Sequence, residues 1–172
     1  MTVAVDVIAI LLSSAACVTD LRTRRIPNGL TFGSAGAGLV FHAVTGGFAG
    51  LLHGVEGWGV GVALFFLPFA LGGMGGGDIK LLAALGAWLG PGETVWLALY
   101  TGVAGGIMAL VVAGLRGYLR QAVSNVWLLL SHWRVSGLSP VHEISLVGST
   151  GPKLAYALPI LIGTVLTLWL QH

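Results

Sequence analysis

The chain has 172 residues, of which 56% are hydrophobic and only 8% are charged, and its mean hydropathy is +0.93. About a quarter of the residues in a soluble globular domain are charged, so this composition excludes a soluble protein and predicts one membrane domain covering residues 1–172. The isoelectric point is near 9.0, but the net charge is only +2, which gives no support to a nucleic-acid partner. Membrane lipid is the expected surrounding instead.

Long apolar segments alternate with short polar ones, which predicts an all-α chain that satisfies its backbone groups within helices. The fourth apolar segment has only 11 residues, and it is expected to gain length from Gly77, Asp78 and the turn at Gly90. The polar stretch 116–150 is expected to contain an amphipathic helix in the cytoplasmic interface, between the fifth and sixth spans. The six predicted transmembrane helices cover residues 2–20, 30–44, 51–71, 79–89, 94–115 and 154–170.

The basic residues predict the orientation of these spans. With six spans, all eight Lys and Arg side chains fall on one side of the membrane, as the positive-inside rule requires. If segment 79–89 turned back instead of crossing, Arg116, Arg120 and Arg134 would lie outside. We therefore expect a multi-pass protein of the cytoplasmic membrane with both termini outside. The first span is expected to be retained, because Asp6 stands where a signal peptide carries positive charge.

Two aspartates lie at the same depth in this topology. Asp20 ends the first span, and Asp78 follows the glycine-rich segment 72–77 and begins the fourth. Two carboxylates that share a site do not both ionise readily, so one can take a proton from water while the other polarises a peptide carbonyl. This pattern predicts acid–base hydrolysis with no cofactor and no metal. Cys17 is the only cysteine, so a CxxC metal site is also absent from the sequence.

Simpler roles compete with this interpretation. Asp78 has the position of a helix N-cap, and Asp20 could form a surface ion pair with Arg22 or Arg24. The whole chain could instead be a small transporter or channel subunit that relays ions or protons through Asp20, Asp78 and Lys80. It could also be a structural membrane protein whose glycines serve packing alone. A relay would place charges at mid-depth, whereas these charges lie at one edge.

The segment from Gly75 to Asp78, followed by Lys80, matches the motif GxGDxK, and the chain resembles the type IV prepilin peptidases of the GxGD class of membrane aspartyl proteases. Asp20 with Arg22, Arg25 and Asn28 resembles the first catalytic motif of that family, and segment 153–159 resembles its last-helix pattern. The resemblance implies that Asp20 and Asp78 are the catalytic pair. They would cleave the leader peptide of Flp-type prepilins at the cytoplasmic membrane face.

The resemblance also implies roles for the surrounding residues. Gly75 and Gly77 would give the substrate backbone room, and Lys80 would orient Asp78 or contact an acidic side chain of the precursor. Arg22, Arg25 and Asn28 would hold Asp20 in place or anchor the loop to lipid headgroups, and anchoring is favoured for the arginines. The sequence lacks the paired CxxC motifs that accompany methyl transfer in longer members. It therefore resembles the short form that serves tight-adherence pili, and peptidase activity alone is expected. The sequence carries no indication of the oligomeric state.

Overall fold

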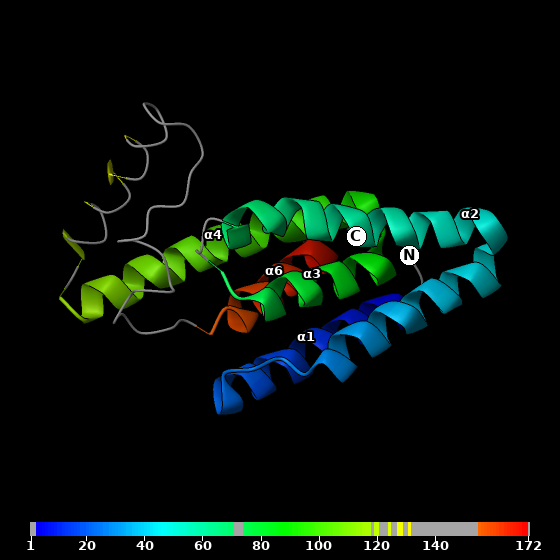
Figure 1. Ribbon diagram of the computed structural model, residues 1–172, viewed down its shortest axis with the longest axis horizontal. Helices are drawn as coiled ribbons and strands as arrows, with labels where there is room; N and C mark the ends of the chain where they lie inside the picture. The colour runs from blue at the N-terminus through cyan, green and yellow to red at the C-terminus, as the bar shows by residue number, and fades with distance from the viewer. Residues whose placement is uncertain are drawn as a thin grey trace.

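The computed structural model describes residues 3–70, 74–117, 119–120, 124, 127–128, 131 and 155–171. These residues confirm the prediction of an all-α chain (Figure 1). The predicted interfacial helix in 116–150 lies almost wholly outside the described residues. The helices are α1 (Val3–Thr23), α2 (Asn28–Ala70), α3 (Gly76–Leu89), α4 (Pro91–Leu115) and α6 (Ala157–Leu170).

Helix α2 consists of two arms that meet at Gly47. The backbone there has φ 61° and ψ −144°, a conformation outside the helical region that glycine adopts without steric penalty. The chain reverses its direction at this point, so the second arm runs opposite to the first (Figure 1). A Cβ atom on Gly50 would overlap the backbone carbonyl of His42, so the turn is tight. The sequence had predicted two helices separated at Gly46 and Gly47, and this local prediction is confirmed.

Among the described residues, three helices are long and apolar enough to cross a membrane, namely α1, α2 and α4, and α6 is a shorter apolar helix. The chain is therefore a multi-pass membrane protein. Helix α3 begins at Gly76 and so includes Gly77 and Asp78, as expected, but its 14 residues rise only about 21 Å. The six crossings stay a prediction.

Helix α3 is the centre of the bundle. It lies between the two arms of α2 (Figure 1) and also contacts α1, α4 and α6. Every residue from Leu81 to Gly90 is buried, which suits a helix that is apolar on all sides. Because α3 is enclosed by other helices, its first turn is held firmly in place, and that turn carries Asp78.

Glycines let the second arm of α2 approach α3 closely. A Cβ atom on Gly61 would lie 2.8 Å from the Cα of Ala83, and one on Gly57 would overlap the carbonyl oxygen of Gly86. The GxxxG spacing of Gly57 and Gly61 therefore marks a helix contact. Gly102 and Gly106 on α4 have the same spacing, but no atom lies within 4 Å of a Cβ atom built on either one.

Helix α6 packs against α1 and α4, and this position brings its first residues to the end of α1. Helix α6 and the residue before it come close to α4 at two positions along the helix. A Cβ atom on Gly105 would lie 2.6 Å from the hydroxyl oxygen of Tyr156, and one on Gly163 would overlap the hydroxyl oxygen of Thr101. These contacts fix the position of α6 along α4. Tyr156 immediately precedes the first turn of α6.

Candidate active site

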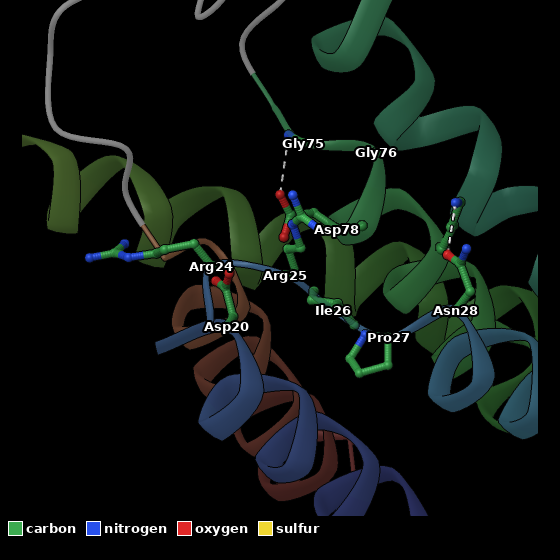
Figure 2. A pocket seen from close by; sticks show the side chains of 11 residues that line it. Asp20, Arg24, Arg25, Ile26, Pro27, Asn28, Gly75, Gly76 and Asp78 are labelled. Atoms are coloured by element: carbon green, nitrogen blue, oxygen red, sulfur yellow. Dashed lines mark hydrogen bonds between the residues drawn. The ribbon is translucent and has the colours of Figure 1, made fainter. Parts of the chain in front are cut away.

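A cavity of about 500 Å³ lies where the end of α1, the loop to α2 and the start of α3 meet. It is called the acid pocket here because two carboxylates face it from different helices, Asp20 from α1 and Asp78 from α3 (Figure 2). The other lining residues come from the loop after α1, from the first residue of α2 and from the glycine segment around the start of α3. They are Arg24, Arg25, Ile26, Pro27, Asn28, Gly75, Gly76, Gly77 and Lys80.

Asp20 lies in the last turn of α1 and is 9% exposed. The backbone N–H of Ala157 donates to its Oδ2 atom over 3.4 Å. Ala157 is the first residue of α6, so the carboxylate of Asp20 lies at the positive end of that helix dipole, where negative charge is stabilised. Residues that are far apart in the sequence thus combine to hold this side chain.

Asp78 is 8% exposed and is the third residue of α3. Its backbone N–H donates to the carbonyl of Gly75 over 3.1 Å, and its Oδ2 atom accepts from the N–H of Gly75 over 3.2 Å. Gly75 is therefore the N-cap, and the alternative that Asp78 itself is the N-cap is wrong. Its carboxylate instead reaches back one turn to satisfy the N-cap amide, which is the acidic half of a capping box.

The loop between α1 and α2 forms one wall of the acid pocket. Arg24 has a positive φ of 55°, which turns the chain sharply after α1. Pro27 immediately precedes α2, and its carbonyl accepts from the N–H groups of Leu30 and Thr31 in the first turn of that helix. Arg25 and Asn28 also line the pocket, and both are exposed at its edge.

Arg22 does not line the acid pocket, and Arg24 does. The reason is helical geometry. Helix α1 continues to Thr23, so residue 22 is rotated about 200° from Asp20 around the helix axis. Arg24 lies beyond the helix, but its backbone N–H donates to the carbonyl of Asp20 over 2.9 Å, which keeps Arg24 beside Asp20. Of the two arginines considered as ion-pair partners for Asp20, only Arg24 is thus on the correct side.

Lys80 connects the two walls of the acid pocket. Its Nζ atom donates to Oδ1 of Asn28 over 3.0 Å and lies 5.4 Å from the ring centroid of Phe32, within the range of a cation–π contact. Lys80 therefore contacts the start of α2, rather than Asp78, in this structure. This arrangement fixes the first turn of α3 against α2.

Tyr156 is a further residue near the two carboxylates, and the sequence analysis gave it no role. Tyr156 immediately precedes Ala157, whose backbone N–H donates to Asp20, and its side chain is packed against Gly105 of α4. The only signal in the sequence was that Tyr156 falls within the last-helix pattern 153–159. Ile26, Pro27 and Gly76 were also not assigned to the site, although each stands next to a residue that was.

The site offers carboxylates and cations but no cluster typical of a metal centre. Among the described residues, no three His, Cys, Asp or Glu side chains come together in a way that could hold a metal ion. What the described groups can do is donate and accept protons beside a peptide. The glycines on one wall leave space for an extended backbone to approach them.

A sequence profile described as the type IV leader peptidase family matches residues 7–110, which is more than half of the chain. Three relatives carry the name prepilin leader peptidase/N-methyltransferase. One from Pectobacterium carotovorum subsp. carotovorum is 37% identical over 106 residues, 58% of this chain and 38% of that protein. One from Neisseria gonorrhoeae is 34% identical over 121 residues, 66% of this chain and 41% of that protein. One from Burkholderia pseudomallei (strain 1026b) is 39% identical over 113 residues, 62% of this chain and 36% of that protein.

The chain spans about two fifths of the length of these curated relatives. No solved structure matches it.

Proposed function

Since the chain belongs to the type IV leader peptidase family, we propose that it is a membrane aspartic endopeptidase that removes the leader peptide of Flp-type prepilins at the cytoplasmic membrane face. The observation that carries this proposal is that Asp20 and Asp78, on different helices and both buried, line one pocket. The relatives' name supports a prepilin as the substrate. A proton relay has no comparable support, because the two acids lie at helix ends rather than at mid-depth.

The two carboxylates act as one acid–base pair in this proposal. Close negative charges in a buried pocket repel each other, so the pair retains one proton near neutral pH. The ionised member removes a proton from a water molecule, whose oxygen attacks the scissile carbonyl carbon, while the protonated member donates a hydrogen bond to the carbonyl oxygen. Collapse of the tetrahedral intermediate transfers a proton to the leaving nitrogen. The rate therefore falls on both sides of a pH optimum.

The edge of the acid pocket carries positive charge from Arg24, Arg25 and Lys80. Such an edge attracts an acidic side chain of the precursor. We assign that contact to Lys80, which of these three cations is the one on α3, the helix that carries Asp78. Gly75 and Gly77 leave the substrate backbone room beside Asp78. We assign Arg22, which is exposed and outside the pocket, to anchoring the loop at the headgroups.

The proposed enzyme is one domain of six spans with both termini outside the cytoplasm. One contact supports the single domain: the family profile ends at residue 110, yet the amide of Ala157 contacts Asp20. The site thus depends on α6 as well as on the matched segment. We also propose peptidase activity alone, without methyl transfer, because the CxxC motifs that accompany that activity do not occur in the sequence.

The test is co-expression with an Flp-type pilin precursor, followed by mass spectrometry of the precursor. The wild type is expected to shorten the precursor without adding the mass of a methyl group to the new amino terminus. Asp20→Asn and Asp78→Asn keep the shape of each side chain but remove its ability to ionise, so each is expected to leave the precursor whole. A folded, membrane-inserted variant that still cleaves at the normal rate would remove that aspartate from the catalytic pair.

A further inference from the structure

The start of α6 has a single backbone donor to offer Asp20. Tyr156 occupies the N-cap position, where Ser, Thr, Asp or Asn usually accepts the N–H groups of the first turn. Among residues 157–159, which the structure describes, the N–H of Leu158 donates to a backbone carbonyl over 3.2 Å, and Pro159 has no N–H. The N–H of Ala157 is the donor that remains, and Asp20 accepts from it. Asp20 thus takes the place of a capping side chain for α6.

This contact depends closely on the position of α6. The distance from the N atom of Ala157 to Oδ2 of Asp20 is 3.4 Å, near the upper limit for a hydrogen bond. A shift of the backbone away from α1 by well under an ångström would therefore break it and leave a buried carboxylate with one donor fewer. Whatever fixes the position of residue 157 also fixes the carboxylate of Asp20.

The side chain of Tyr156 packs directly on the backbone of α4 at Gly105. A Cβ atom on Gly105 would lie 2.6 Å from the hydroxyl oxygen of Tyr156, 2.9 Å from Cζ and 3.2 Å from Cε2. The outer edge of the ring therefore occupies space that only a glycine leaves open. Because Tyr156 and Ala157 are adjacent in the chain, a ring fixed on α4 also fixes the amide that follows it.

The same ring has free space beside it. Tyr156 lines a second cavity, of about 330 Å³, between the second arm of α2 and α4, together with the buried side chains of Phe65 and Met74. A side chain that is closely packed on all sides cannot move without disturbing its neighbours. A ring that borders a cavity can move, so the contact with Gly105 is what holds Tyr156 in place. If that contact is lost, the ring can shift while the bundle stays folded.

We propose that Tyr156 is a positioning residue for the peptidase reaction, because its ring, packed on Gly105, holds the amide of Ala157 on Asp20. This inference rests on the proposed function. The described lining of the acid pocket does not include Tyr156, so the ring acts through the amide and not on the substrate. Loss of the contact leaves the carboxylate of Asp20 free to turn, which slows the chemical step, whereas the residues that contact the substrate stay in place.

Two substitutions break this contact from opposite sides. Gly105→Ala displaces the ring, and Tyr156→Ala removes it. Both are expected to lower kcat for the precursor about tenfold or more and to leave KM within about twofold of the wild type, because a misplacement of about 1 Å at a reacting group can cost 10²-fold. Gly106→Ala meets no atom within 4 Å and is the matched control on α4, with both constants unchanged. A rise in KM with kcat unchanged would overturn the inference.

A second control separates positioning from a general loss of stability. Gly54→Ala adds a methyl group 3.0 Å from the side chain of Leu39 and 3.2 Å from the carbonyl oxygen of Ala87, at the end of α3 opposite to Asp78. It should lower the unfolding temperature in detergent, as Gly105→Ala does, but leave kcat of the folded protein unchanged. An equal loss of kcat in both variants would make the effect one of stability and overturn the inference.

Tyr156→Phe tests whether the ring or its hydroxyl group matters. The ring is kept, so kcat should stay within about twofold of the wild type. In the double variant with Gly105→Ala, the atom nearest to the new methyl group is gone, so part of the lost kcat should be restored. A loss in Tyr156→Phe as large as in Tyr156→Ala would assign a chemical role to the hydroxyl group and overturn the positioning role.

Hydrogen exchange tests the contact without any substrate. The exchange rate of the Ala157 amide is measured by NMR on ¹⁵N-labelled protein in detergent micelles. Gly105→Ala and Tyr156→Ala are each expected to raise this rate about tenfold or more, because the amide loses a charged acceptor, and Gly106→Ala should not change it. Unchanged exchange in both variants would overturn the inference even if the wild type cleaves its precursor. If both variants free the amide but the wild type cleaves no prepilin, the peptidase proposal fails and the positioning of Asp20 by Tyr156 stands.

Discussion

Glycines occur at both ends of α3, but they have different surroundings at the two ends. In its second half, Gly86 lies so close to Gly57 of α2 that a Cβ atom on either one would overlap the carbonyl oxygen of the other. At its start, a Cβ atom on Gly76 or Gly77 would lie 3.5 Å or 3.4 Å from a side chain, which is ordinary contact distance. The glycines in the contact between α2 and α3 thus leave no room for a side chain, whereas the glycines at the start of α3 leave room for a methyl group.

This difference separates two uses of the same residue. In the contact between α2 and α3, glycine lets two backbones touch, so its contribution is to stability. In the acid pocket, glycine leaves a volume open beside a buried carboxylate, and we propose that its contribution there is to substrate access. Substitutions at the two ends should therefore affect different measurements.

Asp78 gives the largest expected effect, because it combines the proposed chemical role with a structural one. Asp78→Asn and Asp78→Ala are both expected to lower cleavage about 10³-fold or more, since neither side chain transfers a proton. Asparagine still offers an oxygen to the N–H of Gly75, so the free energy of unfolding should change little. Alanine removes this acceptor and should lower that free energy by about 1 kcal/mol. Cleavage assays and thermal unfolding in detergent measure the two effects. Residual activity in Asp78→Ala that exceeds that of Asp78→Asn would contradict the assignment.

Gly61→Ala tests the contact between α2 and α3. The new Cβ atom would lie 2.8 Å from the Cα of Ala83 and 2.9 Å from the carbonyl oxygen of Leu82, and backbone atoms in a packed bundle move little. We expect the free energy of unfolding to fall by about 1–3 kcal/mol. Gly59→Ala on the same helix meets no atom within 4 Å and is the control, with unchanged or slightly raised stability. Equal unfolding temperatures for the two variants would show that this contact is looser than described.

Gly77→Ala makes the corresponding change in the acid pocket. Its Cβ atom would lie 3.4 Å from Ile26, so stability should stay within about 0.5 kcal/mol of the wild type. The added methyl group occupies space that the substrate backbone needs, so kcat/KM for the precursor should fall several-fold. Gly33→Ala on α2 meets no atom within 4 Å and lies outside the pocket lining, and it should leave both quantities unchanged. A variant that is destabilised but fully active would place Gly77 with the packing glycines instead.

Features that depend on local patterns were predictable from the sequence. The breaks at Gly47 and Gly90 follow from turn residues between apolar runs, and both have positive φ in the structure. The order of spans and the distribution of basic residues predict that Asp20 and Asp78 lie at one level of the membrane, and in the structure the two side chains line one pocket. Hydrophobic pattern and chain order are sufficient for such features.

Features that depend on one turn of helix, or on contacts between distant segments, were not predictable. The first span was expected to end at Asp20, but α1 continues to Thr23, and Arg24 rather than Arg22 lines the pocket. The GxxxG spacing is the same in α2 and α4, and only the packing reveals which pair touches another helix. The contact of Ala157 with Asp20 joins residues 137 positions apart, which no local pattern encodes.

The two arginines give the smallest expected effect and the sharpest test of the pocket's boundary. Arg24→Gln removes a positive charge from the edge of the acid pocket, so kcat/KM for a precursor with an acidic side chain near the bond should fall about twofold to fivefold, and the loss should shrink as salt is added. Arg22→Gln removes the same charge two residues earlier, on the side of α1 that faces away, and should leave kcat/KM unchanged at every salt concentration. Both arginines lie at the same membrane surface, so a general effect of surface charge would lower both variants equally. A difference between them would therefore reflect the lining of the acid pocket, which includes Arg24 and excludes Arg22.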